Sequence, residues 1–124
     1  MIELAKKKLV LVVDDQPKVI KFIEIDLKIR GFCVLTSGSG EKAVELVKDE
    51  KPDIVLLDMV MPGKDGIEVL KELRTFTNLP VIAFSASPGN QDLALQAGAN
   101  DFMHKPFDPD DMARKINRFL KSQD

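Results

Sequence analysis

The chain has 124 residues, which is enough for one domain with a core of its own and too few for two ordinary domains. Its 18 lysine and arginine residues against 20 aspartate and glutamate residues leave a net charge of −2, which argues against a nucleic-acid-binding protein because such a protein needs a basic face. One cysteine excludes an intramolecular disulfide, and no stretch reaches the length of a membrane-spanning helix. We therefore expect one cytoplasmic domain over residues 1–124, with an ordered core at about 8–121.

Short apolar runs alternate with helical patterns along the whole chain. The first run, Leu9–Val13, is followed by Pro17, which suits the first turn of a helix, and Gly31 is a natural stop for that helix. Later runs are likewise followed by apolar residues at helical spacing. We expect strands at residues 9–13, 32–36, 53–57, 80–84 and 101–104, and helices that begin near residues 17, 40, 67, 91 and 109.

Five strand–helix units in regular alternation predict an α/β fold with a parallel sheet. Right-handed crossover connections place helices on both faces of such a sheet. The continuous apolar runs fit this arrangement, because strands covered on both faces need apolar side chains on both. Cys33 lies inside the second run, so we expect it to be a small buried hydrophobic residue and not a reactive thiol.

Charged side chains follow three of the expected strands at the point where each strand ends. Asp14 and Asp15 follow the first strand, Asp58 follows the third, and Lys105 follows the fifth. Because ligands bind beyond the carboxyl ends of parallel strands, we expect three carboxylates and one ammonium group to converge there. Clustered carboxylates require a cation, and Mg²⁺ suits a site of carboxylates, water and phosphate oxygens. Zn²⁺ is disfavoured because the chain has one cysteine and one histidine.

Two further residues at this edge are compatible with a phosphate ligand. Lys105 faces the acids, so we expect it to bind a phosphoryl oxygen as a point charge. Ser85 follows the fourth strand and offers a hydroxyl at the same edge, although a serine in this position is often only structural. His104 is more typical of a surface residue than of a ligand. The residues together predict a cation-plus-phosphate site.

The chain resembles the receiver domain of bacterial two-component response regulators, the CheY-like superfamily. The matching segments are residues 12–15, 56–66, 85–86, 97–99 and 102–107, which fall in order and cover nearly the full length. The resemblance implies a flavodoxin-like fold with strand order 2-1-3-4-5. It also implies a phosphorylation-dependent signalling switch that is not an enzyme apart from catalysing its own phosphorylation and dephosphorylation.

The resemblance implies a role for each residue of the site. Asp58 would be the phosphoacceptor, attacking a phosphohistidine on a sensor histidine kinase or phosphotransfer protein. Ser85 and Lys105 would each contact a phosphoryl oxygen. The Mg²⁺ ligands would be Asp14, Asp15, Asp58 and the backbone carbonyl of Val60.

The resemblance further implies how the signal would leave the site. Phe102 would be a switch aromatic that turns inward when Ser85 moves towards the phosphate, although a phenylalanine in a strand is usually a core residue. The bond Lys105–Pro106 would be cis, the isomer that proline makes accessible. An unknown output partner would bind the surface made by the fourth and fifth units, with no direct contact to nucleic acid or membrane.

The sequence departs from the family pattern at two places. Val60 lies two residues after Asp58 and cannot align an attacking water by hydrogen bonding, so we predict slow self-dephosphorylation. The segment 85–98 is about two residues shorter than in many receivers and contains Pro88-Gly89-Asn90, so partner recognition there does not carry over from relatives. Phosphorylation-dependent dimerisation through the last two units is a further hypothesis, with Asp101, Asp111 and Lys115 as candidate residues.

Three other functions remain open. The chain could be the receiver fragment of a longer DNA-binding transcription regulator. It could be a Mg²⁺-dependent phosphohydrolase with Asp58 as nucleophile, but those enzymes use a second acid two residues later, where this chain has Val60. A flavodoxin-like nucleotide binder is disfavoured, because no glycine-rich phosphate loop follows the first strand.

Overall fold

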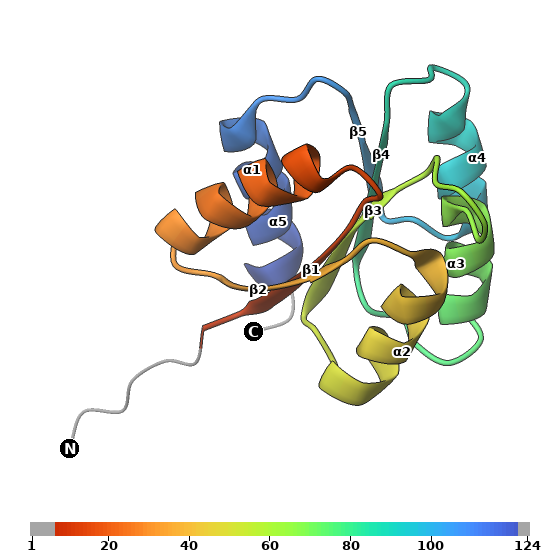
Figure 1. Cartoon of the computed structure of the whole chain (residues 1–124), viewed down its shortest axis with the longest axis horizontal. Coiled ribbons are helices and arrows are strands. Elements are labelled where there is room, and N and C mark those ends of the chain that lie inside the picture. The colour runs from red at the N-terminus through yellow and green to blue at the C-terminus, as the bar shows by residue number, and fades with distance from the viewer. Residues whose placement is uncertain (1–6, 122–124) are drawn as a thin grey trace.

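The computed structural model describes residues 7–121, in which five strands and five helices alternate along the chain (Figure 1). The strands are β1 (Leu9–Val13), β2 (Cys33–Ser37), β3 (Ile54–Asp58), β4 (Val81–Ser85) and β5 (Asp101–His104). The helices are α1 (Pro17–Ile29), α2 (Gly40–Glu50), α3 (Gly66–Leu73), α4 (Asn90–Ala97) and α5 (Pro109–Lys121). The ends of the expected domain, 1–6 and 122–124, lie outside the described residues, and no helix within 7–121 is both long and apolar enough to span a bilayer.

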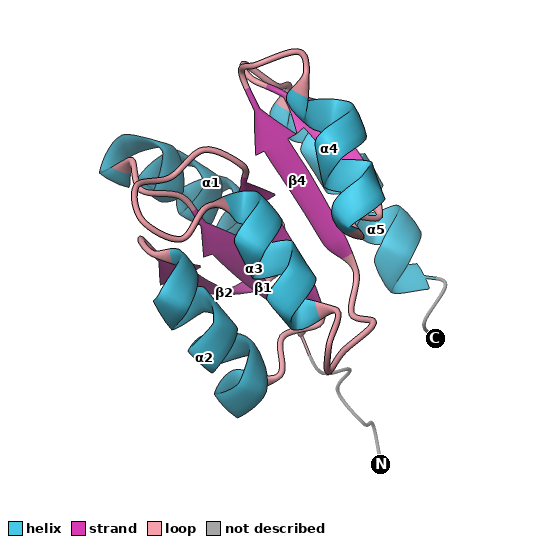
Figure 2. Cartoon of the chain, turned by 90° about the vertical axis from the view of Figure 1, so that its right-hand side faces the viewer, coloured by secondary structure: helices cyan, strands magenta, loops and turns pink. Residues whose placement is uncertain are grey.

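The five strands form one parallel sheet in the order β2-β1-β3-β4-β5. Helices α1 and α5 cover one face of this sheet, and α2, α3 and α4 cover the other, which faces the viewer in Figure 2. Parallel neighbours need a crossover, and right-handed crossovers in the two directions from β1 put helices on opposite faces. The α/β fold expected from the pattern of the sequence and the strand order implied by the resemblance are both confirmed.

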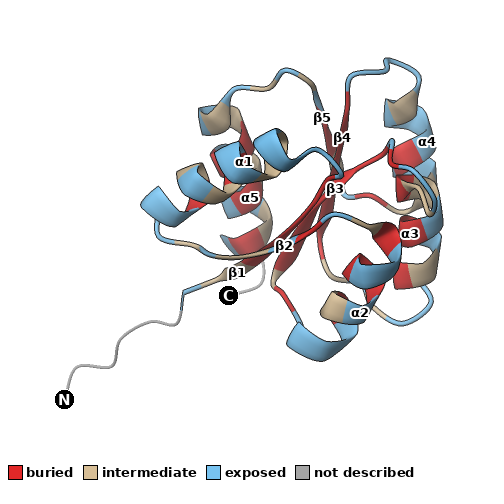
Figure 3. Cartoon of the chain, in the orientation of Figure 1, coloured by how far each residue is buried: buried red, intermediate tan, exposed pale blue. Residues whose placement is uncertain are grey.

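The central strands are buried on both faces (Figure 3). In β1, Leu11 and Val13 pack with the helices of one face, whereas Val10 and Val12 pack with α1 and α5 on the other. Successive side chains of a strand point to opposite faces, so a sheet with two covered faces needs an unbroken apolar run. This packing explains why the strand sequences show no alternation of polar and apolar residues.

The expectation that Cys33 is buried is wrong. Cys33 is exposed at the start of β2, Val34 and Leu35 are partly buried, and Ser37 is the only fully buried residue of this strand. The reason is that β2 is an edge strand, which pairs with β1 alone and is covered less completely by the helices. Phe32, expected as the first residue of this strand, instead precedes it and is partly buried against α1 and α5.

Strands β2, β3 and β4 begin and end one residue later than expected. Asp58 and Ser85 therefore belong to the sheet and do not follow it. β3 ends at Asp58, whose backbone is in register with Phe84. β4 ends at Ser85, which is in register with His104 on β5. The carboxylate of Asp58 and the hydroxyl of Ser85 therefore project from the last paired positions of the sheet, where the backbone is held by hydrogen bonds on a rigid element.

The chain after β3 returns closely past the end of that strand. A Cβ atom added to Gly66, the first residue of α3, would lie 2.7 Å from the Cα of Met59 and 2.9 Å from the carbonyl oxygen of Asp58. The helix begins here because Asp65 and Glu68 form a capping box, in which each side chain accepts from the backbone of the other. Glycine is thus required by space at Gly66, which lets α3 start directly against the Asp58 strand end.

Candidate functional site

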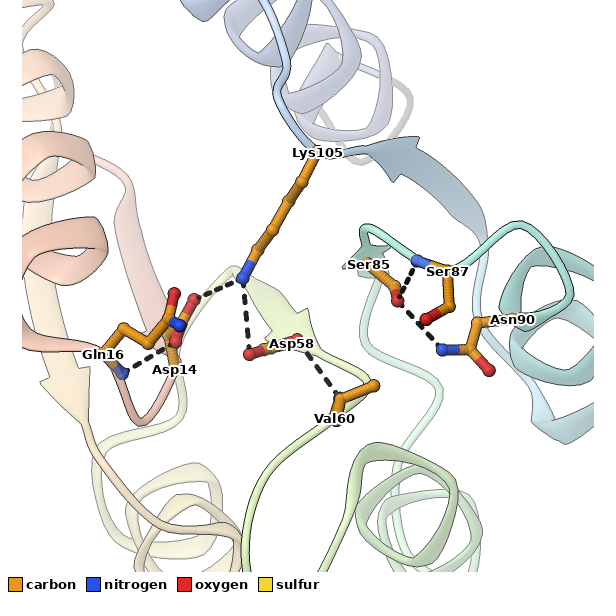
Figure 4. Close-up of polar contacts among 8 residues, drawn as sticks. All are labelled: Asp14, Gln16, Asp58, Val60, Ser85, Ser87, Asn90 and Lys105. Atoms are coloured by element: carbon orange, nitrogen blue, oxygen red, sulfur yellow. Dashed lines mark hydrogen bonds and ion pairs between the residues drawn. The ribbon is translucent and has the colours of Figure 1, made fainter.

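Asp14, Asp58 and Lys105 meet at the carboxyl edge of the sheet, as the sequence predicts. Lys105 Nζ lies 3.2 Å from Asp14 Oδ2 and 3.5 Å from Asp58 Oδ2 (Figure 4). Both carboxylates are almost fully buried, with Asp14 at 0% and Asp58 at 2% exposure. Three strands that are far apart in sequence, β1, β3 and β5, therefore end in one charged cluster with a single ammonium group between two buried acids.

Asp15 is the exposed member of this acidic group. One carboxylate oxygen each from Asp14, Asp15 and Asp58 lie within 4.8 Å of one another. Asp14 Oδ1 accepts a 2.8 Å hydrogen bond from the Gln16 backbone N–H, which fixes the orientation of that carboxylate. Oxygen ligands at this spacing fit a hard divalent cation, and Mg²⁺ commonly uses one or two carboxylates with water and phosphate oxygens. The cluster could hold a metal ion.

Asp58 sits in an environment that disfavours its charge. Burial raises the pKa of Asp58 to about 6, and the neighbouring Asp14 carboxylate contributes to the increase. A 3.1 Å hydrogen bond from the Val60 N–H to Asp58 Oδ1, and the charge of Lys105, lower this pKa in turn. Asp58 is consequently ionised at neutral pH, but its negative charge is destabilised, which increases its tendency to bind an electrophile or a cation.

Lys105 is held in place by its surroundings as well as by its charge partners. Its ammonium nitrogen lies 5.1 Å from the centre of the Phe84 ring, a distance at which the ring face attracts a cation. Its backbone N–H donates a 2.9 Å hydrogen bond to the carbonyl of Ser85. The Lys105–Pro106 peptide bond is cis, as the resemblance implied. These contacts aim the lysine across the ends of β4 and β3.

Ser85 is buried, with 1% exposure, and its hydroxyl contacts the following loop. The hydroxyl oxygen accepts a 3.0 Å hydrogen bond from the Ser87 N–H and a 2.9 Å hydrogen bond from the side-chain amide of Asn90. Figure 4 shows the hydroxyl facing these two residues, whereas Lys105 reaches Asp58 from the other side. Sequence reasoning did not single out Asn90, although an amide residue at the start of a helix five positions after Ser85 is a usable signal.

The polar groups open onto a surface hollow of about 680 Å³. Its wall contains Asp15, Asp58 and Lys105 together with Ser85, so a small ligand in the hollow would lie beside all four, whereas the buried Asp14 is not part of the wall. The exposed Val60 side chain lies at its rim. The lining residues are Asp15, Gln16, Asp58, Val60, Met61, Pro62, Ser85, Ala86, Ser87 and Lys105.

Phe102 and His104 lie on the same side of β5. Phe102 is 5% exposed and packs in the core under α2, α3 and α4, so its ring is inward in this structure. The His104 ring stacks edge-on against it at 5.0 Å between centroids. His104 is exposed, as expected, and contacts the side-chain oxygen of Gln91 at 3.2 Å. The ring is inward here while the Ser85 hydroxyl faces Ser87 and Asn90, so an inward ring does not require Ser85 to move towards Asp58. That Phe102 changes orientation on phosphorylation stays a prediction.

The charged residues suggested for dimerisation have partners within the chain. Lys115 Nζ lies 3.2 Å from the Asp101 carboxylate, and Arg114 lies 2.8 Å from Asp111. A dimer that used these charges would have to exchange them for contacts with a second copy. The Arg114–Asp111 pair is exposed and therefore weak, whereas the Lys115–Asp101 pair is partly buried. Dimerisation through these charges stays a prediction.

The sequence matches the response regulator receiver domain family over residues 10–117. The transcriptional regulatory protein KdpE of Mycobacterium tuberculosis is 39% identical over 115 residues, which are 91% of this chain and 51% of the relative. The chain thus spans about half the length of the curated relatives it matches.

Solved structures agree with this match. The receiver domain of a Francisella response regulator superposes with a TM-score of 0.90 at 33% identity, covering 95% of this chain and 100% of the other. The beryllofluoride-activated N-terminal receiver domain of RstA from Klebsiella pneumoniae gives a TM-score of 0.86 at 31% identity, covering 91% and 98%. This chain belongs to the response regulator receiver domain family of two-component signalling.

Proposed function

We propose that this protein is a phosphorylation-dependent switch in which Asp58 accepts a phosphoryl group from a phosphohistidine of a histidine kinase or phosphotransfer protein. The observation that carries the proposal is the buried Asp58 carboxylate, which lies 3.5 Å from Lys105 at the base of a hollow open to solvent. In the transfer, an Asp58 oxygen forms a bond to phosphorus as the bond from phosphorus to the donor imidazole nitrogen breaks. The nucleophile is the carboxylate, which is the main form at neutral pH because the pKa of Asp58 is about 6.

Neutralisation of charge explains the composition of the site. Phosphoryl transfer proceeds through a loose transition state with negative charge on the equatorial oxygens, so catalysis is mostly positioning and electrostatic stabilisation. Lys105 would bind one phosphoryl oxygen, and the Ser85 hydroxyl would donate to another. A Mg²⁺ ion would supply the remaining positive charge when bound. Its proposed ligands are Asp14, Asp15, Asp58 and the Val60 carbonyl.

A second hollow beside Lys105 is the surface proposed for the phosphodonor. It is lined by apolar side chains that include Phe22 on α1 and Phe107, and it also includes Lys105 itself. From Phe22 an exposed apolar stripe continues along α1 through Ile25 and Ile29, which are 49% and 81% exposed. Any protein that delivers a phosphoryl group to Asp58 must cover the rim of the site. An apolar stripe that starts at that rim is therefore suited to bind it.

The proposal is tested by intact mass after incubation with Mg²⁺ and acetyl phosphate. The wild type should gain one phosphoryl group, and Asp58→Asn should gain none. A matched control is Asp49→Asn, an exposed position on α2, which should behave as the wild type. A wild type that gains no phosphoryl group, or an Asp58→Asn variant labelled to the same extent, would contradict the proposal.

A second candidate is that this chain is the receiver of a longer transcription regulator. KdpE is a transcriptional regulatory protein of which the matching region is only about half, and this observation favours a further output region. The coding sequence after Asp124 distinguishes the two candidates directly. In either case we propose that the protein acts in the cytoplasm and that it catalyses only its own phosphorylation and dephosphorylation. The phosphohydrolase alternative lacks the second acid, since Val60 occupies that position.

A further inference from the structure

The start of α4 is tied to the sheet by side chains and not by a helix cap. Gly89 precedes the helix and provides no capping side chain. Instead, Asn90 donates its side-chain amide to the buried Ser85 hydroxyl at 2.9 Å, and Gln91 contacts His104 at 3.2 Å. The short connection between β4 and α4 makes this reach available, because only four residues separate Ser85 from Asn90. Figure 4 shows the contact between Asn90 and the Ser85 hydroxyl directly.

Helix α4 buries few side chains, namely Ala94 and, in part, Ala97 in its last turn. Ala94 is its one buried residue among the eight, and Leu93 and Leu95 are 53% and 41% exposed. A segment with few buried apolar contacts opens or shifts at low cost in free energy. One hydrogen bond to a buried group is therefore a large part of what holds the first turn of α4.

The Ser85 hydroxyl has limited hydrogen-bonding capacity. A serine hydroxyl has two acceptor positions and one proton to donate. In this structure both acceptor positions are used, one by the Ser87 N–H and one by Asn90. The hydroxyl proton is left to donate, and a phosphoryl oxygen on Asp58 would accept it in a charge-assisted bond stronger than the neutral bond from Asn90. The phosphoryl group and Asn90 would therefore compete for the position of the Ser85 oxygen and not for the same lone pair. A displacement towards Asp58 would lengthen the 2.9 Å contact and break it.

We propose that Asn90 is a positioning residue that holds the Ser85 hydroxyl and the first turn of α4 in the resting arrangement, and that a phosphoryl group on Asp58 competes with Asn90 for that hydroxyl. The inference rests on the proposed function of Asp58 and adds to it the device that would transmit the change to α4. Loss of the bond releases the first turn of α4, which carries the exposed Leu93. Asn90 makes no contact with the acidic cluster in the described contacts, so its effect acts through Ser85.

The test measures binding of beryllofluoride, a stable phosphoryl mimic, with Mg²⁺ by ¹⁹F NMR. Asn90→Ala removes the competing bond from the resting state, so it should bind the mimic about fivefold more tightly, which is the effect of one neutral hydrogen bond on an equilibrium constant. Gln91→Ala is the matched control, since it alters the same helical turn without touching Ser85, and it should bind as the wild type. Far-UV circular dichroism and thermal unfolding establish that each variant is folded.

A double-mutant cycle separates the positioning role from a general effect on α4. In a Ser85→Ala background, Asn90→Ala should leave the affinity for the mimic unchanged, because the hydroxyl it would release is absent. A second measurement uses the wild type alone: the ¹⁵N-labelled side-chain amide of Asn90, assigned by its loss in Asn90→Ala, should shift when the mimic binds.

Each outcome decides between the two proposals. If the wild type binds no beryllofluoride and gains no phosphoryl group, the proposed function of Asp58 fails. If the wild type binds but Asn90→Ala binds equally or more weakly, only the role of Asn90 is overturned. The same holds if the fivefold effect persists in Ser85→Ala, or if the Asn90 amide signal is unchanged by the mimic.

Discussion

Replacing Asp58 by asparagine should stabilise the metal-free protein at neutral pH. Asp58 is 2% exposed, and its pKa is about 6 in the folded protein against an ordinary value of 3.8. The folded state therefore binds more protons than the unfolded chain between about pH 4 and pH 6, and stability from this group falls as the pH rises through that window. The stabilisation that comes from the raised pKa of Asp58 is complete below about pH 4 and is lost above about pH 6. Asparagine carries no charge and has no such loss.

The magnitude follows from the difference between the two pKa values. A difference of about two units corresponds to about 3 kcal/mol at 1.36 kcal/mol per unit. Because the hollow is open to water, which screens the charge, we expect the measured gain to be about 1–3 kcal/mol. The variant does not leave Lys105 without a partner, since Asp14 remains 3.2 Å from the ammonium group.

The assay is urea unfolding in EDTA, followed by far-UV circular dichroism because the chain contains neither tryptophan nor tyrosine. At pH 7.5 the free energy of unfolding of Asp58→Asn should exceed that of the wild type by the amount above. At pH 4.5 the difference should fall to about a third, since Asp58 is then protonated in the folded state. Added Mg²⁺ should narrow the gap at pH 7.5 by binding the folded wild type. A variant no more stable than the wild type at pH 7.5 in EDTA would refute the reasoning.

Three further predictions concern single side chains. Lys105→Met should shift the acid limb of the phosphorylation rate with acetyl phosphate to higher pH, because the lysine lowers the pKa of Asp58; an unchanged pH profile would show that the ammonium group does not act on the nucleophile. Val60→Asn should accelerate loss of the phosphoryl group several-fold by aligning a water, measured by intact mass over time, and an equal decay rate would contradict it. Arg74→Lys should lower the free energy of unfolding by about 2 kcal/mol, measured in urea. The Arg74 guanidinium donates to the backbone carbonyls of residues 77, 79 and 98 and to the Asn100 side chain, and an ammonium group cannot make all of these bonds. A loss below about 0.5 kcal/mol would be inconsistent with this role.

The acidic site could be predicted from the sequence because one rule of sheet geometry is sufficient for it. Asp14 and Asp58 each follow an apolar run, and Lys105 follows the short segment Asp101–His104. The carboxyl ends of parallel strands share an edge whatever the order of the strands. Their contact at 3.2 and 3.5 Å needed no information about loops. The strand order itself came from the family resemblance, since periodicity alone does not say which strand lies beside which.

The wrong expectation for Cys33 and the missed contact of Asn90 both depend on tertiary structure, which the local sequence pattern does not determine. Cys33 was expected to be buried because its run is apolar, but burial depends on the position of β2 at the sheet edge. The order implied by the resemblance already places the second strand there, so the two expectations were inconsistent. Asn90 was missed because its contact depends on where α4 begins, one residue earlier than expected. Helix starts without a capping side chain are poorly specified by sequence, and Gly89 gives no such signal.

The strength of the individual contacts limits what phosphorylation alone can do in this protein. Shifting a two-state equilibrium from 1:99 to 99:1 takes about 5.5 kcal/mol of differential interaction. A charge-assisted hydrogen bond from Ser85 to a phosphoryl oxygen contributes about 1.5–3 kcal/mol, and loss of the Asn90 bond subtracts about 1 kcal/mol from it. The remainder must come from elsewhere, and the exposed Leu93 in the first turn of α4 offers an apolar contact for it. The phosphorylated protein should therefore populate both arrangements in isolation, and binding of an output partner to α4 should complete the transition.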